Sequence, residues 1–141
     1  MDQRTSGQLP DIRKSLLLKA PVGKVWEAVA TSEGIAAWFM PNTFKPELGY
    51  DFQLNAGPYG MSPCKVTELN PPNRLSFAWG EAWTLTFELK EREGGTEFTL
   101  IHGGWSEEKA TEFGEPHSVV RDRMDQGWSG LTEKLRAHVE G

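Results

Sequence analysis

VRDRMDQGWSGLTEKL, residues 120–135, is the stretch of sequence that decides the fold. Its apolar side chains recur at spacings of four, four, three and four residues, which is the period of one helix face: Val120, Met124, Trp128, Leu131 and Leu135. The pattern predicts a long helix from Pro116 to about Val139, and its apolar face must be covered by other elements. Gly127 weakens a helix interior by about 0.8–1.0 kcal/mol relative to Ala. The missing side chain would let a bulky group or the sheet approach this helix closely, and simple tolerance of the glycine is the competing interpretation.

The chain before this helix alternates between apolar and polar residues in short segments, which predicts strands. The clearest strand spans Trp83 to Leu89, and the others are predicted at Ile12–Lys19, Tyr50–Leu54, Cys64–Leu69, Leu75–Trp79 and Thr96–His102. Leu17 breaks the alternation of the first strand, which predicts partial cover on both of its faces. Two short helices are predicted between the first and second strands, one starting at Pro21 and one capped by Thr31-Ser32 and ended by Pro41.

Tight turns at Asn70–Asn73 and Gly94-Gly95 join these strands into an antiparallel meander. The order of elements therefore predicts an α+β fold in which a sheet packs against the last helix. We expect one domain over residues 11–141 behind a disordered lead-in of residues 1–10, and a loop or short helix over residues 106–114.

Composition excludes several classes of function. The chain of 141 residues has a net charge of −5 and no basic patch with interleaved aromatics, so neither nucleic acid nor an anionic membrane surface is an expected partner. The longest apolar stretch, Ile35–Met40, is too short to span a bilayer, and residues 1–10 lack the apolar core of a secretory signal. Cys64 is the single cysteine, so no intrachain disulfide can form. Together these features predict a cytoplasmic protein.

An ordered set of motifs resembles a known family. It begins with Pro21-x-x-x-Val25-Trp26-x-Ala28 and Trp38-Phe39, and it continues with Pro71-Pro72-x-Arg74-Leu75 and Gly95-Thr96-x-Phe98-Thr99-Leu100. It ends with Gly127-Trp128-x-x-Leu131-x-x-x-Leu135. Over about residues 10–139 this set resembles bacterial proteins similar to the C-terminal domain of the activator of the heat-shock-protein-90 ATPase, in the START/Bet v-type (SRPBCC) superfamily.

The resemblance implies a helix-grip fold, in which a curved antiparallel sheet grips the C-terminal helix around a hydrophobic cavity. It also implies a lipid-like or polycyclic aromatic ligand, and it carries no shared catalytic residues. From the strand faces and the helix stripe we expect the ligand to contact an apolar set with one polar member: Trp38, Phe39, Phe77, Trp79, His102, Met124 and Trp128. For each aromatic residue, simple core packing is the competing interpretation.

Two other functions stay open. An enzyme of cyclase or hydrolase type would use the same cavity with His102 as general base, and a chaperone-linked interaction module would act through its surface. The sequence identifies no protein partner. No phosphate-binding loop is present, and His102, Glu107, Glu108, Glu112 and His117 match no zinc spacing, so no cofactor and no metal are expected. Ser129 and Cys64 both lack the setting of a nucleophile.

Overall fold

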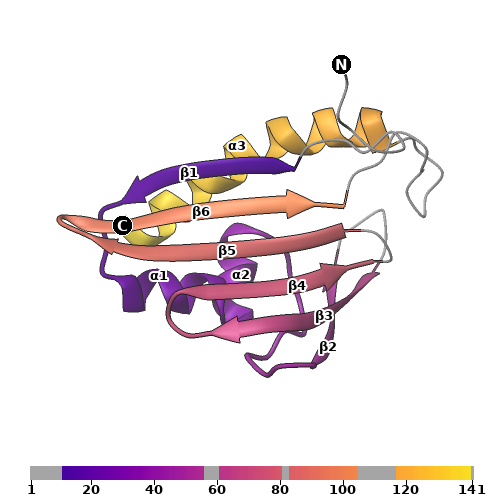
Figure 1. The fold of residues 1–141 in the computed structure, drawn as a ribbon, viewed down its shortest axis with the longest axis horizontal. Helices are drawn as coiled ribbons and strands as arrows, with labels where there is room; N and C mark the ends of the chain where they lie inside the picture. The colour runs from indigo at the N-terminus through magenta and orange to yellow at the C-terminus, as the bar shows by residue number, and fades with distance from the viewer. Residues whose placement is uncertain (1–10, 56–60, 81–82, 105–116, 141) are drawn as a thin grey trace, which may run out of the picture.

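The computed structural model describes residues 11–55, 61–80, 83–104 and 117–140, with residues 117–120 described by their backbone alone. The elements follow the predicted order of a strand, two short helices, five strands and a long helix (Figure 1). Their bounds are β1 Ile12–Leu18, α1 Val22–Val29, α2 Ser32–Trp38, β2 Asp51–Asn55, β3 Met61–Asn70, β4 Arg74–Trp79, β5 Trp83–Arg92, β6 Gly95–Gly103 and α3 His117–Glu140. The expected segments 1–10 and 106–114 lie outside the described residues.

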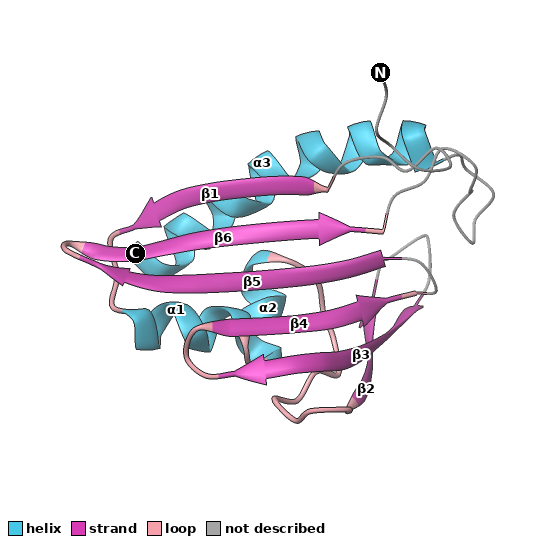
Figure 2. Ribbon diagram, in the orientation of Figure 1, coloured by secondary structure: helices cyan, strands magenta, loops and turns pink. Residues whose placement is uncertain are grey.

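Six strands form a single antiparallel sheet in the order β1-β6-β5-β4-β3-β2. Strands β2 to β6 follow each other as a meander, and β1 joins the far edge by pairing with β6. All three helices lie on one face of the sheet, with α1 and α2 behind its lower half and α3 behind its upper half (Figure 2). This is the predicted α+β helix-grip architecture. None of the helices in the described part of the chain is long and apolar enough to cross a membrane.

Alternation along the strands sends apolar side chains to the helix-covered face. Leu85, Phe87 and Leu89 of β5 are at most 1% exposed, and Phe98 and Leu100 of β6 are fully buried. The opposite face carries hydroxyl pairs and ion pairs, including the 2.8 Å contact between the side-chain oxygens of Ser76 and Thr86. The sheet is therefore one wall of a single core, with a polar outer surface.

The structure contradicts the expectation that other elements partly cover both faces of the first strand. Its side chain is 46% exposed, because β1 is an edge strand and no element packs on its outer face among the described residues. Ile12 and Leu18, on the inner face of the same strand, are at most 1% exposed. The alternation of β1 is thus ordinary, and Leu17 is an exposed apolar residue within it.

The corner between α1 and α2 is fixed by backbone contacts. Pro21 is the N-cap of α1 rather than its first residue, and Thr31 caps α2 by accepting a hydrogen bond from the backbone N–H of Gly34 at 3.0 Å. A Cβ on Gly34 would lie 2.2 Å from the carbonyl oxygen of Glu27. Only glycine permits this approach, so Gly34 lets the start of α2 pack directly on the end of α1.

Helix α3 contacts β1, α1 and α2. Its predicted stripe faces inward: Trp128 and Leu135 are fully buried, while Met124 and Leu131 pack half-buried against the core. The side chain of Val120 lies outside the described part of the helix. The prediction of a close approach at Gly127 is wrong. Gly127 is exposed, and no described atom lies within 4 Å of a Cβ placed there. It faces away from the sheet, and no described residue approaches it closely.

Candidate functional site

His102 lies at the centre of an aromatic cluster between the sheet and α3. It shares the inner face of β6 with Thr96, Phe98 and Leu100, and it is fully buried. The β4–β5 hairpin pairs Trp79 with Trp83, and the pairing of β5 with β6 places Leu85 opposite His102. We call Phe39, Trp79, Trp83, His102 and Trp128 the tryptophan–histidine cluster.

Three tryptophan rings surround the imidazole of His102. Trp79 stacks on it with ring centroids 5.3 Å apart and an interplanar angle of 23°. Trp83 meets it edge-on at 4.9 Å and 83°, and Trp128 does so at 5.9 Å and 84°. The imidazole is therefore held by apolar rings from two strands and from α3.

A hydrogen bond ties α3 to the sheet inside this cluster. The indole Nε1–H of Trp128 donates to Nδ1 of His102 at 3.0 Å. Because Nδ1 accepts, this bond assigns the proton to Nε2 and makes the imidazole neutral. In this structure the Nδ1 lone pair of His102 is therefore engaged by the indole N–H of Trp128, and His102 acts as a hydrogen-bond acceptor within the cluster.

Phe39, the C-cap residue of α2, brings the short helices into the cluster. Its ring lies 5.1 Å from that of Trp128 and 5.7 Å from that of Trp79. Trp38 stacks on Phe39 at 5.6 Å and 24°, and its own indole N–H donates to the carbonyl oxygen of Ala28 at 2.8 Å. One aromatic network thus joins β4, β5, β6, α2 and α3.

The structure brings together most of the predicted ligand-contacting residues. Phe39, Trp79, His102 and Trp128 touch one another, and Trp38 adjoins them through Phe39. Phe77 lies apart from these residues on β4. Its ring centroid is 5.1 Å from that of Phe52 and 6.2 Å from that of Phe87. Met124 lies on α3 one turn before Trp128 and is half-buried.

Trp83 is a member of the cluster that the predicted set omits. It shares a strand face with Leu85 and Phe87 and stands directly opposite Trp79 across the hairpin. The alternation of Trp83–Leu89 together with the turn at Gly80 was the signal that could have placed it beside Trp79 and His102.

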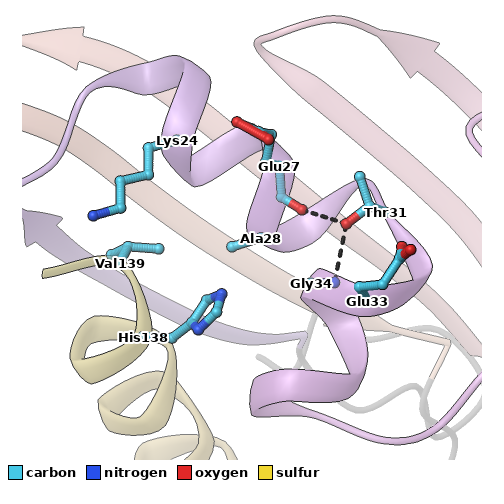
Figure 3. Close-up of a pocket in the computed structure, with 8 residues that line it drawn as sticks. All are labelled: Lys24, Glu27, Ala28, Thr31, Glu33, Gly34, His138 and Val139. Carbon is cyan, nitrogen blue, oxygen red and sulfur yellow. Dashed lines mark hydrogen bonds between the residues drawn. The ribbon is translucent and has the colours of Figure 1, made fainter. Parts of the chain in front are cut away.

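Most of these aromatic side chains are buried. Trp38, Phe77, Trp79, His102 and Trp128 are each at most 5% exposed, whereas Phe39 and Trp83 are half-buried. Two pockets formed by described residues lie elsewhere. One, of about 350 Å³, lies between α1, the start of α2 and the end of α3 (Figure 3), and the other, of about 320 Å³, lies beside the β5–β6 turn.

Neither pocket contains a predicted site residue. The walls of the pocket in Figure 3 are held by Thr31, whose hydroxyl donates to the carbonyl oxygen of Glu27 at 2.6 Å. Its charged side chains, on Lys24, Glu27 and Glu33, are exposed to water.

Other chemically active side chains stand apart from the cluster. Cys64 is 5% exposed on β3, with its sulfur 3.7 Å from the carbonyl oxygen of Ser62, and Ser129 is exposed on α3. Glu107, Glu108 and Glu112 lie outside the described residues, as does the side chain of His117. On the outer face of the sheet, the hydrogen bond from Arg74 lowers the pKa of Glu68, and Arg74 also pairs with Glu88.

Sheet, helices and buried cluster define the class: a helix-grip fold with an aromatic interior. The sequence-family model for "Activator of Hsp90 ATPase homolog 1-like protein" matches residues 19–140, and the chain belongs to that family. No curated protein matches the sequence.

Solved structures give the same fold. The Bacillus halodurans protein BH1534 is 49% identical, with a TM-score of 0.85 over 94% of this chain and 99% of its own. The Aha1 dimer from Colwellia psychrerythraea is 19% identical, with a TM-score of 0.74 over 94% of this chain and 97% of its own. DynU16, a protein of the dynemicin biosynthetic locus, is 20% identical, with a TM-score of 0.75 over 94% of this chain and 48% of its own. At 19% and 20% identity the likeness is one of fold.

Proposed function

We propose that the protein binds a small hydrophobic molecule, lipid-like or polycyclic aromatic, between the sheet and α3. The observation that carries the proposal is the buried His102 within a shell of tryptophans, hydrogen-bonded to α3 through Trp128. Sites for small apolar ligands consist mostly of aromatic and aliphatic side chains with a few placed polar groups, and the cluster has this composition.

The ligand would lie against the predicted residues on the α3 side of the cluster. Phe39 and Trp128, with ring centroids 5.1 Å apart, form one of the contacts between the short helices and α3. Binding requires these two rings to separate, and Met124 next to them has an unbranched side chain that adapts to the shape of a ligand. Trp79 and His102 would then supply a flat wall and one polar contact. Trp38 and Phe77 would form the deeper part of the site.

Family membership supports a binding role without naming the ligand. DynU16, which shares the fold, is described as a protein of a biosynthetic locus, and this favours a polycyclic natural product as one candidate ligand. The commitment of the His102 lone pair to Trp128 favours binding over acid–base catalysis. We therefore propose a carrier or sensor rather than a cyclase or hydrolase.

Two ligands test the proposal: palmitate and a planar tricyclic anthraquinone, each titrated while intrinsic tryptophan fluorescence and melting temperature are recorded. At a hundred times its dissociation constant, a ligand that binds the folded state stabilises it by about 2.7 kcal/mol, which raises Tm by about 5–10 °C for a domain of this size. We expect at least one of the two to produce this shift.

Two matched substitutions locate the site. Trp128→Phe alters the cluster, whereas Trp26→Phe makes the same change on α1 at a half-buried position outside it. The ligand-induced rise in Tm should fall in the Trp128 variant and remain in the Trp26 variant. If neither compound shifts Tm, or if both variants respond like the wild type, the proposal is wrong.

A further inference from the structure

The pocket in Figure 3 lies where α1, the start of α2 and the end of α3 meet, and we call it the corner pocket. None of its lining residues belongs to the tryptophan–histidine cluster. On α1 it is lined by Lys24, Glu27 and Ala28, which lie one helical turn apart on the same face of the helix. Its volume of about 350 Å³ falls within the range of small-molecule sites.

The walls of the corner pocket are fixed by the fold. The hydroxyl of Thr31 donates to the carbonyl oxygen of Glu27 at 2.6 Å and accepts from the backbone N–H of Gly34 at 3.0 Å. Ala28 and Val139 are at most 2% exposed as residues of the core, and they give the pocket an apolar floor. A preformed pocket of this kind lowers the ordering cost of binding a ligand.

Charged side chains of both signs surround this floor. In Figure 3, Lys24 and Glu33 lie at opposite ends of the pocket, with Ala28 and His138 between them. Within the described part of the chain, the side chains of Lys24, Glu27 and Glu33 form no ion pair with one another. The pocket therefore has a positive end, a negative end and an apolar surface between them.

This distribution of charge separates the classes of ligand that the pocket could take. Glu27 and Glu33 oppose a purely anionic ligand such as a phosphate, and Lys24 opposes a ligand with two positive ends. The described residues contain no group of three or more His, Cys, Asp or Glu side chains that could hold a metal ion. A ligand that satisfies both ends must carry one charge of each sign, separated by an apolar segment.

We propose that the corner pocket binds a linear ω-amino acid, in which an ammonium and a carboxylate group stand at the two ends of a short methylene chain. Lys24 pairs with the carboxylate and Glu33 pairs with the ammonium. The methylene chain lies on the floor of Ala28 and Val139, and the imidazole of His138 offers a hydrogen bond beside it. This site is independent of the proposed function, because it shares no residue with the cluster.

Titration with 6-aminohexanoate, followed in a ¹⁵N correlation spectrum, tests this site. We expect shifts of the backbone amides of residues 24–34 and 137–139, with a dissociation constant in about the millimolar range, because the charged partners are exposed to water. Hexylamine and hexanoate are matched compounds that each lack one of the two charges. Each should bind the corner pocket about two- to fivefold more weakly, the effect of losing one exposed ion pair.

Two substitutions assign the two ends of the ligand. Lys24→Gln should abolish the preference for 6-aminohexanoate over hexylamine, because the carboxylate has lost its partner, and should keep the preference over hexanoate. Glu33→Gln should have the reverse effect. Glu47→Gln, which makes the same change in the exposed loop before β2, is the control and should keep both preferences. A substitution that only disturbed the local structure would weaken all three compounds alike.

Three results would overturn the corner site. They are an absence of amide shifts around the pocket at saturating 6-aminohexanoate, equal affinities for the three compounds, and equal effects of Lys24→Gln and Glu47→Gln. Shifts confined to the indole N–H groups of Trp79, Trp83 and Trp128 would place the compound in the cluster instead, and they too would overturn the site.

Discussion

Replacing Trp128 by phenylalanine removes the indole N–H that holds His102 but keeps an aromatic ring on the same helix face. Trp128 is fully buried and its Nε1 donates to Nδ1 of His102 at 3.0 Å. The substitution leaves a buried acceptor without its donor, which costs about 1–3 kcal/mol, and the smaller ring also leaves a small void. We expect the free energy of unfolding to fall by about 2–4 kcal/mol.

A double-mutant cycle isolates the hydrogen bond from the void. His102→Leu removes the acceptor with a side chain of similar volume, so the double variant no longer contains an unpaired polar group. Its loss of stability should be smaller than the sum of the two single losses, with a coupling energy of about 1–2 kcal/mol.

Trp38→Phe is the matched control for this cycle. Trp38 is also buried, at 1% exposure, and its indole N–H also makes a hydrogen bond, but it donates to the carbonyl oxygen of Ala28 at 2.8 Å. Its effect should add to that of His102→Leu within about 0.5 kcal/mol. Urea unfolding followed by far-UV circular dichroism gives the four stabilities of each cycle, provided that the m-values agree. A Trp128–His102 coupling no larger than that of the control would refute the reasoning.

Two further predictions concern the α1–α2 corner and the outer face of the sheet. Gly34→Ala should destabilise the protein by about 1–3 kcal/mol in thermal unfolding, because its Cβ would lie 2.2 Å from the carbonyl oxygen of Glu27. The control Gly23→Ala should stabilise the protein by up to about 1 kcal/mol, because nothing described lies near its Cβ position. Equal effects of the two substitutions would contradict this account of the corner. The hydrogen bond from Arg74 is the chief cause of the lowered pKa of Glu68 in the folded state. The ionised Glu68 therefore stabilises the fold at pH values above its unfolded-state pKa of about 4.3. This stabilisation is lost as pH falls through the lower pKa of the folded state. The difference in Tm between wild type and Glu68→Gln should therefore shrink between about pH 5 and pH 3, and a difference that stays constant over this range would count against the Arg74 contact.

The elements were predictable because both periodicities are strong in this sequence. The alternation of Trp83–Leu89 appears in the structure as β5, and the helix predicted from Pro116 to Val139 is α3, His117–Glu140. The settings of Leu17 and Gly127 differ from their predictions for a common reason. Periodicity gives the direction of a side chain relative to its own element, but exposure depends on which other element lies opposite. That β1 forms an edge and that Gly127 faces away from the sheet are properties of the assembled fold.

The sequence predicts which helix and strand faces carry the residues of the candidate site, but not which of these residues contact one another. Phe39, Trp79, His102 and Trp128 lie on the inner faces of their elements, and the fold closes these faces on one another. The hydrogen bond between Trp128 and His102 joins residues 26 positions apart. It depends on the position of α3 along the sheet and on its rotation, and no local pattern determines either. Trp83 required the pairing of the β4–β5 hairpin in addition to the strand pattern.

The indole N–H resonances of the protein test ligand binding at the cluster most directly. The sequence contains six tryptophans, each with one indole N–H, and a ¹⁵N correlation spectrum recorded during titration with the anthraquinone follows them separately. Binding between the sheet and α3 predicts large shifts for Trp79, Trp83 and Trp128 and little change for Trp26 on α1. Shifts confined to Trp26, or no shifts at saturating ligand, would contradict it.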